Sequence, residues 1–233
     1  MLVAAAVCPC PPLLVPEVAA GAAAELDPLR TACADAIGVL AASRPDLLVV
    51  VGAGERGHVW EGGGEASLRP YGVDRTLRLG TGEDPAPLAT PSLAVAAWLL
   101  ERTTIAAPLH ACAVPGDAPV DRMLGLGRGL ADIAERVALL VMGDGSACRT
   151  LKAPGYLDER AEPYDAAVAA ALGAADTAVL AGLDAELSAA LKVSGRAPWQ
   201  VLAGAAEGTA GLGGELLYDE APYGVGYFVA AWS

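Results

Sequence analysis

Three short and nearly continuous apolar runs constrain the fold of this chain more than any other feature of its sequence. They occupy residues 2–8 (LVAAAVC), 46–52 (DLLVVVG) and 137–142 (VALLVM). Runs of this length that lack polar alternation are typical of strands buried on both faces of a sheet. Prolines follow the first run and Pro45 precedes the second, so both are expected to have sharp limits.

Segments with helical spacing separate these strands. The predicted helices cover residues 17–42, 91–102, 120–136, 162–192 and 199–206. Further strands are expected near 73–79 and 110–114, and the segment 215–232 has the pattern of strand, turn and strand. This alternation predicts an α/β fold in which helices flank a mixed central β-sheet. Because no linker, internal repeat or low-complexity tail interrupts the pattern, residues 1–233 are expected to form a single domain.

The composition excludes several classes of protein. Hydrophobic residues make up 54% of the chain and charged residues 18%, a balance that supports a large core and argues against disorder. The net charge of −13 argues against nucleic acid or an anionic membrane as a partner, because both require a basic surface. A small-molecule ligand is compatible with this charge, but the charge names none.

The compartment follows from the N-terminal segment and from the cysteines. The N-terminal apolar stretch has no basic flank and prolines interrupt it within ten residues, so it is interpreted as a buried strand and not as a signal peptide. No other run approaches the roughly 18 residues that span a membrane. The five cysteines are an odd number, and without an export signal we expect reduced thiols in the cytoplasm.

Three predicted strand ends carry polar or soft side chains on loops shaped by glycine or proline. These loops are CPCPP at 8–12, GAGERGHVWEG at 52–62 and GDGSACRT at 143–150. In open α/β folds ligands collect at the carboxyl ends of the strands. The convergence of the three loops at that edge is the main indication of a site in the sequence.

The first loop raises the question of what Cys8 and Cys10 do. Residues two apart on an extended chain point to the same side, and a C-x-C pair occurs in some metal sites. No second C-x-C or C-x-x-C pair is present, which argues against a four-cysteine zinc site. The alternative is that Cys8 packs in the core and Cys10 is a loop thiol, as the frequent burial of free cysteine favours.

The second loop holds His58 with Glu61 three residues later. Softer metals accept Cys, His and carboxylate ligands together, so this pair is a candidate part of a metal site. The alternative is an exposed loop histidine. His110 is the other histidine of the chain and precedes Cys112 in a predicted strand, where packing is the favoured role.

The third loop places Asp144, Ser146 and Arg149 where they can contact a polar substrate, and Asp144 and Ser146 are the candidate catalytic residues. The alternative is a tight turn with a capping Asp or Ser. The loop is neither a G-x-S-x-G nucleophile elbow nor a G-x-x-x-x-G-K phosphate loop.

The order of these motifs resembles the subunit-B-like (LigB-like) superfamily of class III extradiol ring-cleavage dioxygenases, which includes the Memo-like proteins. The family's first strand leads into His-Pro-Pro, where this chain has Cys10-Pro11-Pro12. Its strand with the second metal histidine is similar to PDLLVVVG at 45–52, and its Gly-Asp-x-Ser-His segment is similar to residues 143–147. Tyr164-Asp165 and the ending YDEAPYGVGYFVA at 218–230 continue the resemblance over most of the chain.

The resemblance implies a non-haem Fe(II) or another divalent metal held by Cys10, His58 and a carboxylate, with Glu220 as the candidate and Glu61 as its rival. Two departures oppose ring cleavage. Cys10 stands where relatives have a metal-binding histidine, and Ala147 stands where they have an acid–base histidine. Extradiol relatives often associate, so a homo-oligomer is compatible with the resemblance.

Three hypotheses follow from these residues. The first is a non-catalytic protein that keeps the fold and the cleft as a binding or regulatory module. The second is a metal-binding protein without ring-cleavage activity, close to the Memo-like pattern. The third is an active metal-dependent dioxygenase or related oxidoreductase that uses Cys10, His58 and a carboxylate. The departures at Cys10 and Ala147 favour the first two.

Overall fold

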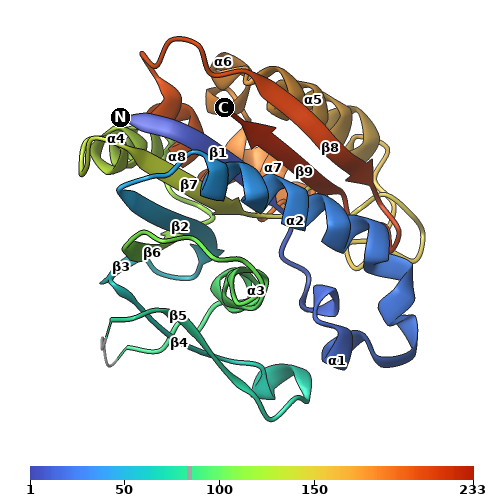
Figure 1. Ribbon diagram of the computed structural model, residues 1–233. Helices are drawn as coiled ribbons and strands as arrows, with labels where there is room; N and C mark the ends of the chain where they lie inside the picture. The colour runs from blue at the N-terminus through green and yellow to red at the C-terminus, as the bar shows by residue number, and fades with distance from the viewer. Residues whose placement is uncertain (83–85) are drawn as a thin grey trace.

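A seven-stranded mixed sheet forms the centre of the protein in the computed structural model, which describes residues 1–82 and 86–233. The strand order is β3-β6-β2-β7-β1-β9-β8 (Figure 1). The strands are β1 (Leu2–Cys8), β2 (Leu47–Gly54), β3 (His58–Glu61), β6 (Leu109–Pro115), β7 (Val137–Met142), β8 (Gly214–Glu220) and β9 (Tyr227–Trp232). The four central strands β6, β2, β7 and β1 are parallel, whereas β3, β9 and β8 pair antiparallel with their neighbours.

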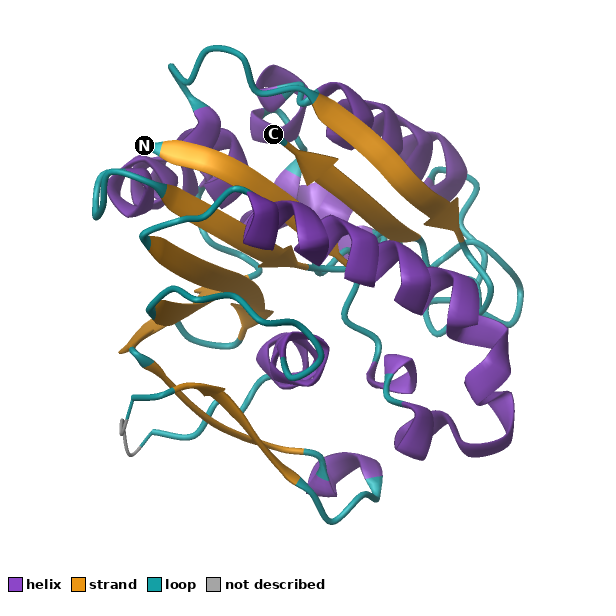
Figure 2. Ribbon diagram, viewed as in Figure 1, coloured by secondary structure: helices purple, strands orange, loops and turns teal. Residues whose placement is uncertain are grey.

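Helices cover both faces of this sheet (Figure 2). One face packs against α1 (Pro16–Ala19), α2 (Asp27–Ala42), α3 (Pro91–Leu100) and a separate two-stranded sheet of β4 (Gly63–Ser67) and β5 (Thr76–Gly80). The other face packs against α4 (Val120–Ala131), α5 (Ala161–Ala174), α6 (Thr177–Ala181), α7 (Ala185–Ala190) and α8 (Arg196–Ala206). Single turns of 3₁₀-helix at Pro12–Leu14 and Arg69–Tyr71, and a longer one at Ala20–Leu26, complete the elements.

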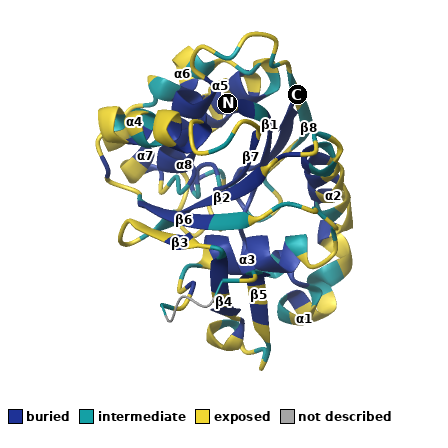
Figure 3. Cartoon of the chain, turned by 60° about the vertical axis from the view of Figure 1, so that its left-hand side comes forward, coloured by how far each residue is buried: buried dark blue, intermediate teal, exposed yellow. Residues whose placement is uncertain are grey.

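The apolar runs of the sequence are explained by these two covered faces. Alternate residues of each strand enter different cores: Ala138 and Leu140 of β7 belong to the cluster under α2 and α3, while Leu139 and Val141 belong to the cluster under α4 and α8. Every residue of β7 is therefore buried, and the central strands form the buried interior in Figure 3. The prediction of an α/β fold with a mixed sheet between helices is confirmed.

Two local predictions are wrong. Residues 162–192 do not form one helix, because Ala175 adopts a left-handed conformation after α5, and Asp176 and Asp184 cap two new short helices. Between residues 53 and 90 the sequence predicts a strand only near 73–79, whereas the structure has β3 and β4 there as well as the expected β5. Within the described ranges, no helix combines the length and the apolar content that crossing a membrane requires.

Helices α4 and α8 approach each other closely at two glycines. A Cβ atom on Gly127 would lie 2.0 Å from the Val201 carbonyl oxygen, and one on Gly204 would lie 2.2 Å from the Leu124 carbonyl oxygen. Gly129, in the same helix as Gly127, has nothing within 4 Å of its would-be Cβ. The helix crossing therefore requires glycine at Gly127 and Gly204 but not at Gly129.

Candidate functional site

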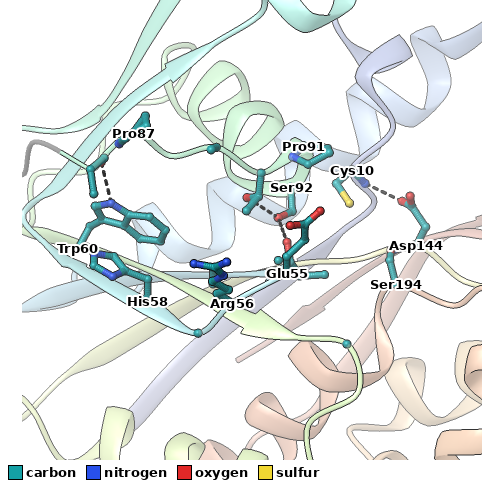
Figure 4. Close-up of a pocket in the computed structure, with 18 of the residues that line it drawn as sticks. Cys10, Glu55, Arg56, His58, Trp60, Pro87, Pro91, Ser92, Asp144 and Ser194 are labelled. Carbon is teal, nitrogen blue, oxygen red and sulfur yellow. Dashed lines mark hydrogen bonds between the residues drawn. The ribbon is translucent and has the colours of Figure 1, made fainter.

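A cavity of about 920 Å³ lies at the carboxyl edge of the parallel strands. Its walls come from the three predicted strand-end loops, from the start of α3 and from the segment before α8. The lining residues are Cys10, Pro12, Ala53, Gly54, Glu55, Arg56, Gly57, His58, Trp60, Ala86, Pro87, Ala89, Thr90, Pro91, Ser92, Ala113, Gly116, Asp144 and Ser194. Figure 4 shows Cys10, Ser92, Asp144 and Ser194 toward one end of the view and His58 and Trp60 toward the other.

Cys10, Asp144 and Ser194 form what we call the inner end of the cavity. The backbone N–H of Cys10 donates to Asp144 Oδ1 at 2.7 Å, and the backbone N–H of Asp144 donates to Ser194 Oγ at 2.9 Å. These contacts join the loops after β1 and β7 to the segment before α8. They form because β1 and β7 are adjacent parallel strands, so both loops leave the sheet at the same edge.

Burial determines the ionisation of the two side chains at this end. It raises the pKa of Asp144 to about 6, although hydrogen bonds from Cys10 oppose the rise. No Arg, Lys or His within the described ranges forms an ion pair with Asp144. Burial, with a smaller contribution from Asp144, also raises the pKa of the Cys10 thiol well above its ordinary value. Cys10 is therefore a neutral thiol at pH 7 and a poor nucleophile.

Two hydroxyl groups line the cavity at the start of α3. Ser92 Oγ donates to the Ala53 carbonyl at 2.7 Å and lies 3.1 Å from Thr90 Oγ1. Because Ser92 has one hydroxyl proton, Thr90 must be the donor in the contact between them. Thr90 also caps the helix by accepting the Leu93 N–H at 3.2 Å. Gly52 permits this approach, since a Cβ there would lie 2.4 Å from Ser92 Oγ.

His58 and Trp60 lie on the edge strand β3, not in a loop. Their rings make a T-shaped contact with 4.3 Å between centroids, and Trp60 Nε1 donates to the Ala86 carbonyl at 2.8 Å. His58 is exposed and Trp60 is buried. The exposed side chains of Glu55 and Arg56, in the turn before β3, lie at the mouth of the cavity.

The two candidate carboxylates of the metal site lie outside this lining. Glu220 is exposed at the end of β8, where it accepts a hydrogen bond from the Tyr218 hydroxyl at 3.1 Å. Glu61 is exposed on β3 and stands opposite His110 in the β3–β6 ladder. Cys10 and His58 thus share a cavity, but Glu220 does not join them.

The side chains do not fit the three-ligand iron site that the resemblance implies. Over residues 1–82 and 86–233, no three His, Cys, Asp or Glu side chains are grouped so that they could hold a metal ion. Two histidines and a carboxylate are the ligands that a non-haem iron of this kind requires. At the inner end the neighbouring donors are one thiol and one carboxylate, so no chemical step is assigned to a metal here.

Ser146 has a structural position in the loop after β7. It is fully buried and does not line the cavity. Its N–H and hydroxyl donate to the two oxygens of buried Asp165 at 2.8 and 2.7 Å, and Arg149 donates to the same carboxylate at 3.2 Å. Asp165 therefore fixes the loop that carries Asp144, and the expectation that Ser146 and Arg149 contact a substrate does not match this geometry. The turn alternative describes Ser146 better.

Cys8 has the core position that the packing alternative gave it. It is fully buried on β1 with its thiol against Cys33, and all five cysteines are free. Sequence reasoning missed Ser92 and Ser194, which belong to no motif, and did not single out Trp60 within the second loop. Thr90 before Pro91 was a usable signal, because a helix cap at the carboxyl edge of a sheet places its hydroxyl there.

Comparisons with known proteins support the fold alone. No protein-family model and no curated protein sequence matches the chain. Among solved structures, it is similar to the crystal structure of the uncharacterised protein JW3007 from Escherichia coli K12, with 16% sequence identity and a TM-score of 0.50 over 99% of each chain. The chain thus shares its α/β architecture over its whole length with a bacterial protein of known structure.

Proposed function

We propose that the protein binds a small organic molecule in this cavity and does not cleave catechol rings. The observation that carries the proposal is the cavity itself. It has the size typical of small-molecule sites and combines apolar walls of proline and alanine with a few polar groups at the inner end. The proposal treats the chain as a divergent relative of the extradiol dioxygenases, as its motifs suggest.

The acid–base histidine of a ring-cleaving site has no counterpart at residue 147. Ala147 has no group that can donate or accept a proton, and the raised pKa of the Cys10 thiol makes it a weak acid. Asp144, with a pKa of about 6, is the titratable group of the inner end that changes charge near neutral pH. One such group suits ligand recognition but does not replace the ligand set and the acid–base histidine of a ring-cleaving site.

A fragment screen observed by protein NMR tests the binding function. We expect fragments to shift the resonances of Ala53, Gly54 and Ala113, whose residues line the cavity. Ala89 is an exposed lining residue, so Ala89→Trp should narrow the cavity and weaken these fragments without disturbing the core. Ala166→Trp, at an exposed position of α5, is the matched control and should leave their binding unchanged. Fragments that bind Ala89→Trp as tightly as wild type would place the binding elsewhere.

An active metal-dependent dioxygenase is the second candidate function, because Cys10 and His58 line one cavity. It is tested by anaerobic reconstitution with Fe(II), metal analysis and oxygen uptake over a panel of catechols. We expect no uptake. Two results together would replace the proposed function with dioxygenase activity. The wild-type protein would bind iron stoichiometrically and lose it in both Cys10→Ala and His58→Ala, and oxygen uptake would occur with at least one catechol.

A further inference from the structure

The two hydroxyls that line the cavity at the start of α3 are hydrogen-bond acceptors toward a ligand. Thr90 and Ser92 have already committed their hydroxyl protons, Thr90 to Ser92 and Ser92 to the Ala53 carbonyl. Both hydroxyls can therefore accept hydrogen bonds from a ligand but not donate them. The Asp144 carboxylate is also an acceptor, and it has about four lone-pair positions, of which the Cys10 N–H occupies one.

The charge at this end is equally one-sided. Asp144 has no cationic partner within the described ranges, and the thiol of Cys10 beside it is neutral. A half-buried carboxylate without a cation is unfavourable in the empty protein. A cation brought by a ligand would remove this cost as it binds.

The contrast between the inner end and the rest of the cavity sets the orientation of such a ligand. The guanidinium of Arg56 is exposed at the mouth and has no ion pair or hydrogen bond with the residues that the structure describes. Exposed Glu55 beside it carries the opposite charge, so this pair gives the mouth no net charge, whereas Asp144 would attract a cationic group at the inner end. Prolines and alanines between the mouth and the inner end, with Trp60 on one wall, suit an apolar or aromatic body.

From this arrangement we infer that the ligand is an organic amine whose ammonium group binds Asp144 while its apolar body fills the cavity toward Trp60. The inference rests on the proposed function and names the chemical class of ligand for the same site. The ammonium supplies hydrogen-bond donors for the Asp144 carboxylate and for the Thr90 and Ser92 hydroxyls, and it supplies the positive charge that Asp144 lacks. A carboxylate ligand would instead place two negative charges together, and a neutral alcohol would supply a donor without the charge.

Three probes of one shape separate these cases: benzylamine, benzyl alcohol and benzoate, titrated at pH 7.5 by protein NMR. Benzylamine should bind at least about tenfold more tightly than the other two, as expected for a charge-assisted hydrogen bond. Asp144→Asn keeps the shape of the side chain and should reduce the benzylamine affinity about tenfold while changing the benzyl alcohol affinity little. Asp35→Asn removes the same charge from an exposed position of α2 and should change neither affinity.

Each alternative result overturns the inference. Benzyl alcohol or benzoate binding as tightly as benzylamine would show that charge does not select the ligand. Benzylamine binding that survives Asp144→Asn would place the ammonium elsewhere, and absence of benzylamine binding would rule out the amine class. In all three cases the proposed function stands or falls separately, because the fragment screen with Ala89→Trp decides whether the cavity binds small molecules at all.

Discussion

Asp144 should make the stability of the empty protein depend on pH in a direction unusual for an acidic residue. Burial raises its pKa from an ordinary value of 3.8 to about 6, so the folded state holds this proton more tightly than the unfolded state does. Stability therefore decreases as the pH rises from about 4 to about 6, since the folded protein must then carry an uncompensated charge. The opposite sign applies to a carboxylate in a salt bridge.

The magnitude follows from the two pKa values. At about 1.36 kcal/mol for each pKa unit, the ionised side chain costs at most about 3 kcal/mol above pH 7. At pH 4.5 the cost is about 1 kcal/mol, because the folded carboxyl is still mostly protonated. Cys10 and Tyr227, the titratable neighbours of Asp144, stay neutral throughout this range because their pKa values are raised as well.

Urea unfolding of wild type and Asp144→Asn at several pH values measures this cost. Asparagine keeps an oxygen for the Cys10 N–H, so the variant should be more stable than wild type at pH 7.5. The difference in the free energy of unfolding should grow by about 2 kcal/mol between pH 4.5 and 7.5 and then level off. Asp35→Asn, exposed on α2, should differ from wild type by less than about 0.5 kcal/mol at every pH.

A difference that stays constant with pH, or a variant that is less stable than wild type at pH 7.5, would refute the reasoning. Either result would mean that the carboxylate is already compensated in the empty protein. It would also remove the electrostatic reason for expecting a cationic ligand at the inner end.

Three further predictions concern the rest of the fold. Gly127→Ala should destabilise the protein by about 1–3 kcal/mol in urea unfolding, because the added Cβ meets a backbone carbonyl of α8. The control Gly129→Ala should be neutral or stabilising by up to about 1 kcal/mol. Equal effects of the two substitutions would contradict the close crossing of α4 and α8. Ser146→Ala should cost about 1–3 kcal/mol because it removes a hydrogen bond from buried Asp165, and an unchanged midpoint would count against this bond. The native protein at pH 8 should react slowly with a thiol reagent, whereas all five cysteines of the unfolded chain should react at once. Rapid labelling of Cys10 in the native protein would contradict this prediction, because it would show that the thiol is accessible and ionised.

The sequence predicted the parts of the fold that depend on strong local patterns. The run VALLVM coincides with β7, and the first two apolar runs match β1 and β2 to within two residues at each end. The prediction of helices failed where several weak signals compete. In residues 162–192 alanine favours helix throughout, and the breaks depend on one left-handed residue, Ala175, and on two aspartate caps.

The candidate site was predictable in its location but not in its membership. Cys10, His58 and Asp144 follow strands, and the carboxyl edge brought them to one cavity. Ser194 reaches the same cavity from a segment before α8 that no strand pattern marks, and Glu220 lies on the far antiparallel strand β8. Which distant segment closes a cavity is decided by tertiary packing, which a local pattern does not contain.

The small sheet of β4 and β5 has a consequence for the rate at which the cavity opens. The wall segment at Ala86–Pro91 is tied to this sheet by the hydrogen bond from the Leu88 N–H to the Glu65 carbonyl at 2.8 Å, and to β3 through Trp60. Two strands alone are marginally stable, whereas the opposite wall belongs to the seven-stranded sheet. Amide hydrogens of β4 and β5 should therefore exchange with solvent faster than those of β2 and β7, and a bound ligand should slow the first group selectively.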